Sequence, residues 1–181
     1  RSLAALRADV EPVSQSDLAR FGLAWQSIGG EGERLHGVEG VYRAVEQLGG
    51  ALVPASALET LVLPSRVSGY SPAHLDELLA RGEVTWAGHA EVGRSDGWVS
   101  LHLTETAPLT LPLVPSSDTL TDQQTEVLAA LEGGGAYFID ALRGRVGLSE
   151  RDLATTLWEL VWLGLIANDT ITPLRELVDT S

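Results

Sequence analysis

The sequence predicts a mainly α-helical protein with small β-hairpins, an α+β fold divided between two units. Apolar residues recur every three or four positions in most segments, which is the spacing of helices that bury one face. Two stretches, residues 83–92 and 97–105, instead alternate apolar with polar or small residues, as strands do. Residues 106–120 are rich in proline and have no helical period, so they are expected to separate the units.

The first predicted helix covers residues 14–28. Its start carries the Ser and Asp side chains that are typical of a helix N-terminus. Leu18, Phe21 and Trp25 follow at helical spacing, so we expect this helix to bury one face. Three glycines, at positions 29, 30 and 32, are expected to end it.

Three more helices and a hairpin complete the first unit. Residues 38–48 form a helix that ends at two glycines, residues 54–67 a short helix bounded by prolines, and residues 71–81 a helix with Ser and Pro at its start. The two alternating stretches then read as strands joined by a turn at residues 95–97. Helices followed by a hairpin is the order of a winged-helix module, in which the hairpin supplies the wing.

The second unit repeats the helical part of this order. We place the boundary near Leu120, which gives units of residues 1–120 and 121–181. Thr121 caps a helix that runs to residue 131, and a break at glycines 133–135 follows. A short helix over residues 138–142, a turn at 144–147 and a third helix over 150–163, capped by Ser, complete a three-helix core. The sequence therefore predicts tandem winged-helix-like units.

The charge of the chain disfavours a basic DNA-binding module. Acidic residues number 25 and basic residues 12, all of them Arg, for a net charge of −13. Residues 1–110 hold fourteen acids and eight Arg, and residues 111–181 hold eleven acids and four Arg, so the charges are −6 and −7. Nucleic-acid contacts must come from local Arg clusters or from surfaces outside this chain.

Composition narrows the class of protein further. The chain begins with Arg1 and contains no Met, so we expect it to be an internal piece of a larger protein. It lacks an apolar stretch of the roughly 18 residues that span a bilayer, so we expect a cytoplasmic protein with no membrane partner. The absence of Cys excludes disulfides and thiolate metal sites.

The candidate DNA contacts are Arg143, Arg145 and Arg151. They lie in or beside the turn before the third helix of the second unit, where winged-helix proteins present basic groups to phosphates. The alternative interpretation is a solvated turn in which these side chains pair with neighbouring acids, Asp140, Glu150 and Asp152.

Trp158 and Trp162 are the candidate interface residues. They extend an apolar arc that covers more than half of the third helix, and such helices are usually buried on two sides. We expect this helix to pack against a neighbouring module. The alternative is that the rings stack on unpaired bases, which requires exposure and nearby positive charge.

Several other residues favour structural roles. Trp86 and Trp98 lie on the paired strands and could form a cross-strand pair, with core packing favoured over a stacking platform. The spacing of the histidines, His74 among them, gives no metal-binding pattern, so no metal is expected. Asp169 could act as a general base, but an Asx turn before Pro173 explains it better.

Four stretches of the sequence resemble one protein family, and they occur in the same order as in that family. PASALETLVLPSRV, YSPAHLDELLARGEVTWAG, DGWVSL and LWELVWLGLIANDTITPLREL, which begin at residues 54, 70, 96 and 157, are similar to the segment after the helicase core in large helicase-related (Lhr) proteins. The resemblance implies a superfamily 2, ATP-dependent 3′-to-5′ DNA helicase associated with DNA repair. It also implies a C-terminal region of tandem winged-helix modules and a β-barrel, similar to winged-helix DNA glycosylases.

The resemblance places the catalytic machinery outside this chain. ATP and Mg²⁺ are expected only in the parent helicase core, because the chain has no GxxxxGK[ST] motif and no lysine. The leading hypothesis is a non-catalytic DNA-binding and scaffolding segment, whose expected partners are DNA, bound weakly, the remaining modules of the same chain and a second copy. The alternatives are part of a DNA glycosylase whose catalytic residue lies elsewhere, and an oligomerisation platform.

Overall fold

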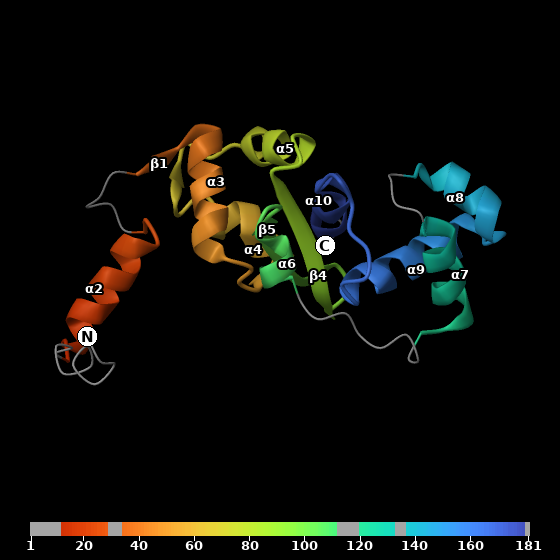
Figure 1. Ribbon diagram of the computed structural model, residues 1–181, viewed down its shortest axis with the longest axis horizontal. Coiled ribbons are helices and arrows are strands. Elements are labelled where there is room, and N and C mark those ends of the chain that lie inside the picture. The colour runs from red at the N-terminus through yellow and green to blue at the C-terminus, as the bar shows by residue number, and fades with distance from the viewer. Residues whose placement is uncertain (1–11, 29–33, 112–119, 133–136, 180–181) are drawn as a thin grey trace, which may run out of the picture.

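The computed structural model describes residues 12–28, 34–111, 120–132 and 137–179. The predicted glycine breaks at residues 29–32 and 133–135, and most of the 106–120 linker, lie outside these ranges. Helices dominate and the sheets are small, so the predicted α+β fold class is confirmed. The molecule is elongated, with α2 at one end, the β4 and β5 strands in the middle and the α7–α8 pair at the other end (Figure 1).

The first unit has the element order and strand order of a winged helix. A three-stranded antiparallel sheet has the order β2-β5-β4, and the hairpin of β4 and β5 forms the wing. The elements are α3 (Gly37–Leu48), β2 (Val53–Pro54), α4 (Ala55–Ala57), η1 (Leu58–Val62), α5 (Pro72–Ala80), β4 (Val84–Val92) and β5 (Asp96–Leu103). Two short strands, β1 (Leu35–His36) and β3 (Val67–Ser68), pair in parallel beside α3.

The short helix predicted within residues 54–67 is present between its two prolines, over residues 55–62, but Pro54 itself is not part of it. Val53 and Pro54 are extended instead, because they pair with Val99 and Trp98 at the edge of the sheet. A proline fits this position, since an edge strand need not donate every backbone hydrogen bond. The helical part that follows is the short α4, which passes into the π-helix η1.

The hairpin turn lies two residues earlier than the predicted 95–97, because Asp96 is already paired with Val92. The Asp96 carboxylate accepts hydrogen bonds from the Ser56 backbone N–H at 3.1 Å and hydroxyl at 2.6 Å. The suggested pair of Trp86 and Trp98 does not form, since the register sets Trp86 opposite Leu101 and Trp98 opposite Ala90. Trp86 is buried in the core, whereas Trp98 is 39% exposed.

The helix α2 (Gln15–Trp25) confirms the first predicted helix but not its buried face. Ser14 caps it by accepting a hydrogen bond from the Asp17 backbone N–H. Leu18, Phe21 and Trp25 are each about 60% exposed, and no residue of the helix is buried. Helical spacing predicts an apolar face, but it does not tell whether the surface that covers this face belongs to the same chain.

The second unit contains the predicted three helices, α7 (Asp122–Leu131), α8 (Ile139–Val146) and α9 (Glu150–Trp162). Their core consists of Val127, Leu142, Val146, Leu153 and Leu160. The predicted end of the short helix at residue 142 is wrong, because α8 continues through Gly144 and ends only at Gly147, which has a φ of 62°. The linker residues that are described also hold one helical turn, α6 (Ala107–Thr110), where none was expected.

A final helix, α10 (Thr172–Asp179), was not predicted and returns to the first unit. Ile171 and Leu174 are buried in the core of the first unit together with Val161 and Trp162 of α9. The boundary near residue 120 stays a prediction. The packing nevertheless joins the units, because α9 contacts β4 and α10 contacts α4.

Candidate nucleic-acid interface

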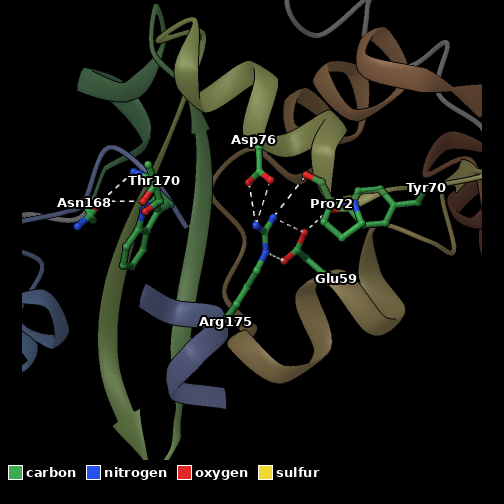
Figure 2. Close-up of polar contacts among 8 residues, drawn as sticks. Glu59, Tyr70, Pro72, Asp76, Asn168, Thr170 and Arg175 are labelled. Carbon is green, nitrogen blue, oxygen red and sulfur yellow. Dashed lines mark hydrogen bonds and ion pairs between the residues drawn. The ribbon is translucent and has the colours of Figure 1, made fainter. Parts of the chain in front are cut away.

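The helix α5 occupies the recognition position of the first unit, but its surface is acidic and bound to another part of the chain. Arg175 of α10 lies between Glu59 and Asp76, with its Nε 2.6 Å from a Glu59 oxygen and its Nη1 2.9 Å from an Asp76 oxygen (Figure 2). Its Nη2 also donates to the Pro72 carbonyl. The Tyr70 hydroxyl donates to the same Glu59 carboxylate. We call these five residues the Arg175 network.

The electrostatics of the Arg175 network are those of a structural ion pair. The hydrogen bonds to Glu59 raise the pKa of the Arg175 guanidinium above its usual value. Burial, and then the hydrogen bond to Glu59, raises the pKa of the Tyr70 hydroxyl. The Arg175 guanidinium therefore stays charged at neutral pH, and the Tyr70 hydroxyl stays neutral. The helix that would enter a DNA groove carries acids instead of bases.

The three predicted arginines lie together where α8 meets α9. Arg143 and Arg145 occupy the last turn of α8, and Arg151 lies in the first turn of α9, after the Ser149 cap. All three are exposed. We call this set the arginine turn. Its three cations lie at a helix N-terminus, which is a common site of phosphate contact, together with an equal number of acids in the first turns of α8 and α9.

Each member of the arginine turn has different local contacts. Arg143 lies 3.2 Å from an Asp140 oxygen and 3.7 Å from a Glu150 oxygen. Both pairs are highly exposed, and exposed pairs contribute only about 0–1 kcal/mol, so a phosphate could replace them. Arg145 donates to the Ala130 carbonyl and lies 4.7 Å from the centre of the Tyr137 ring. Among the described residues, no ion pair forms on Arg151.

Trp158 and Trp162 stack on one another along α9, with ring centres 5.4 Å apart. Trp162 is 9% exposed and lies against the hairpin of the first unit. A Cβ atom at Gly97 would come within 2.4 Å of the Trp162 ring, and one at Gly88 within 2.5 Å of the Val161 carbonyl. Glycine is therefore required at both positions for α9 to approach the strands this closely.

Trp158 is only half-buried, and it lines a cavity with a volume of about 670 Å³. This cavity lies between α8, α9 and residues 166–173, and we call it the aromatic pocket. Its aromatic and polar lining residues are Trp86, Tyr137, Phe138, Trp158, Asn168 and Asp169. Sequence reasoning considered the Trp158 ring and Asp169 separately, and nothing in the sequence indicated that folding brings them to one cavity.

A chain of buried hydrogen bonds inside the first unit does not open onto this surface. The Ser100 hydroxyl lies 2.6 Å from Nε2 of both His89 and His102, and His102 Nδ1 lies 2.7 Å from the Thr110 hydroxyl. Burial lowers the pKa of both histidines. Ser100 and His102 are almost fully buried, so these hydrogen bonds stabilise the core and are not accessible to a substrate.

The described residues offer little support for a metal site or a membrane span. No group of three or more His, Cys, Asp or Glu side chains there could hold a metal ion. None of the helices in those ranges is both long and apolar enough to cross a membrane. His74 has a structural role, because its Nδ1 accepts a hydrogen bond from the Ser71 backbone N–H at the start of α5. Asp169 is exposed, beside the turn that Asn168 forms with Thr170.

Comparison with known proteins gives one consistent result. Residues 13–104 match a family model described as large helicase-related protein, winged-helix domain. A Mycolicibacterium smegmatis protein named Lhr helicase/probable uracil glycosylase is 49% identical over 177 residues, which cover 97% of this chain and 12% of that protein. An Escherichia coli protein named Lhr helicase/uracil glycosylase is 38% identical over 200 residues, which cover all of this chain and 13% of that protein. The chain therefore spans about an eighth of the length of these relatives.

Proposed function

This chain belongs to the Lhr family of large helicase-related proteins, and we propose that it is a non-catalytic DNA-holding segment of such a helicase. It would lie in the C-terminal region, after an ATP-dependent 3′-to-5′ motor that acts in DNA repair. The motor would use ATP and Mg²⁺, and this chain would position the DNA and dock the neighbouring modules. The observation that carries the proposal is the arginine turn, which gathers three exposed cations on an otherwise acidic chain.

The contrast between the two units supports placing the contact in the second one. The recognition-position helix of the first unit carries Asp76 and Glu77, which pair with Arg175 and Arg81. The pair of Arg175 with Glu59 is largely buried, whereas the ion pairs of the arginine turn are exposed. Contact there would be mainly electrostatic, so affinity should be weak and should fall as salt rises.

A charge-matched pair of variants tests this placement. One variant combines Arg143→Gln, Arg145→Gln and Arg151→Gln, and the control combines Arg20→Gln, Arg43→Gln and Arg81→Gln, three exposed arginines of the first unit. Fluorescence anisotropy of labelled DNA over a range of salt concentrations gives the affinity and its salt dependence. We expect the first variant to lower the slope of log K against log salt by roughly 1–3, and the control to leave it unchanged. An equal decrease of this slope in both variants would mean that DNA affinity depends only on the net charge of the chain.

The names of both relatives support a second candidate, part of a DNA glycosylase whose catalytic residue lies outside this chain. Under either candidate the chain alone should release no base. Incubation with uracil-containing and crosslinked DNA, followed by cleavage of abasic sites, tests this expectation. Base release by the chain alone would place a catalytic residue within it and would overturn both candidates.

The exposed apolar face of α2 supports a third candidate, an oligomerisation platform. Sedimentation of the chain and of its Phe21→Glu variant tests it. A concentration-dependent assembly that the substitution abolishes would support self-association through α2. A monomer in both cases would contradict it.

A further inference from the structure

We propose that the aromatic pocket receives an unpaired base of a nucleic-acid strand whose phosphate lies at Arg145. This inference rests on the proposed DNA-holding function and deepens it, because it names the part of the nucleotide that this chain would recognise. It follows from the walls of the pocket, its polar groups and the contact of Arg145 with Tyr137, one of the lining residues.

One wall of the pocket is an aromatic ring held in a fixed position. Trp158 lines the pocket and stacks on Trp162, which in turn lies against the backbone of the hairpin at Gly88 and Gly97. The indole of Trp158 therefore rests on a second ring that has no room to move. A base that stacks on a ring already held in place orders few side chains on binding, which favours affinity.

The loop at the rim is also fixed, and it leaves two polar groups available. Trp86 Nε1 donates to the Thr170 carbonyl at 3.2 Å. The Asn168 side-chain oxygen accepts from the Thr170 backbone N–H at 2.9 Å and from its hydroxyl at 3.1 Å (Figure 2). Because its oxygen is used in this way, the Asn168 amide presents its NH₂ as a donor, while the Asp169 carboxylate presents an acceptor.

A donor beside an acceptor matches the chemistry of a nucleobase. The Watson–Crick edge of each base places a hydrogen-bond acceptor next to a donor, so Asn168 and Asp169 could contact any of the four bases. The pocket volume of about 670 Å³ is larger than one base requires, and its lining is predominantly apolar. We therefore expect binding that depends on the presence of a base and tolerates differences in sequence.

The position of Arg145 favours a nucleotide over an apolar protein segment. Arg145 lies against the ring of Tyr137, and Tyr137 lines the pocket. A phosphate joined to a base in the pocket would thus have a guanidinium close to it. An apolar side chain from a partner protein would contact the apolar lining of the pocket, but it would leave Arg145, Asn168 and Asp169 without a ligand.

The test compares binding to two single strands of equal length and charge. One strand is ordinary DNA, and the other carries stable abasic sites throughout its centre. Ala154→Phe fills the pocket from α9, and Ala129→Phe adds the same ring at an exposed position of α7 outside the pocket. Circular dichroism melts establish that both variants fold before their affinities are measured by anisotropy.

We expect the unmodified chain to bind the ordinary strand about tenfold more tightly than the abasic strand. Ala154→Phe should remove this preference and leave the abasic affinity unchanged, whereas Ala129→Phe should keep it. Equal binding of both strands by the unmodified chain would overturn the pocket proposal while supporting the DNA-holding function. Failure to bind either strand would overturn both. If Ala154→Phe fails to fold, Asp169→Ala, at an exposed position of the rim, serves instead and should weaken the same preference.

Discussion

Each of the two units has three helices in succession, but the charged side chains of the third helix have different partners in the two units. In the first unit the third helix, α5, carries acids and is joined to α10 by Arg175. In the second unit the third helix, α9, begins beside the arginine turn and carries aromatic side chains towards a cavity. A winged-helix fold therefore does not by itself locate a DNA contact. In the function proposed above, the side chains at the start of the third helix make that contact.

The largest expected effect concerns the contact between the units. Trp162→Ala removes a buried ring that lies against Gly88 and Gly97, and we expect it to lower the free energy of unfolding by about 3–5 kcal/mol. Trp98→Ala removes a ring that is 39% exposed and should cost much less. Urea denaturation of both variants checks this difference. Similar losses of unfolding free energy in the two variants would mean that the contact of α9 with the hairpin does not stabilise the chain.

The next effect concerns the Arg175 network, which joins α10 to the first unit. Arg175→Met leaves the half-buried Glu59 carboxylate without its charged partner, and we expect a loss of about 1–3 kcal/mol. The control Arg81→Met breaks an exposed pair with Glu77 and should cost less than about 1 kcal/mol. Denaturation at low and high salt measures both. A larger loss in the control would contradict a structural role for the network.

Trp158→Ala separates packing from base stacking at a single position. Trp158 is half-buried, so we expect its loss to destabilise the chain less than the loss of Trp162. Binding of single-stranded DNA should weaken by about 1–3 kcal/mol. Denaturation and binding titrations on the same protein measure both effects. A large loss of stability together with unchanged DNA binding would support packing alone.

The smallest expected effect is a dependence of stability on pH, confined to the first unit. Burial lowers the pKa of His89 and His102 below the usual 6.5, so the unfolded chain binds protons first as the pH falls. Stability should therefore be constant above pH 6.5 and should fall as the pH decreases from 6.5 towards the folded-state pKa values. In the His89→Gln variant the free energy of unfolding should fall less steeply over this pH range. An unchanged slope would assign the effect to other groups.

The sequence predicted most of the helices because their starts follow from local chemistry. Ser14, Thr121 and Ser149 each cap a helix by accepting a hydrogen bond from the backbone three residues later, as expected from their side chains. The short strand β2 could not be found in this way. Its two residues are extended only because β5, more than forty residues later, pairs with them.

The candidate site was predictable only in part, for the same reason. The arginine turn was visible because its three residues are close in sequence. The contact of Arg175 with Glu59 joins positions 116 residues apart, and the bond from Trp86 to Thr170 joins positions 84 residues apart. Single-sequence patterns carry no information on such pairs, so the Arg175 network and the aromatic pocket appear only in the folded chain.

Hydrogen exchange of the chain with and without single-stranded DNA tests the central claim most directly. The amides of α8, α9 and residues 166–170 should exchange more slowly when DNA is bound, because the nucleotide covers the arginine turn and the aromatic pocket. The amides of α5 should exchange at the same rate in both samples. Slower exchange confined to α5 and the tip of the β4–β5 hairpin would instead place the DNA on the first unit and contradict the account.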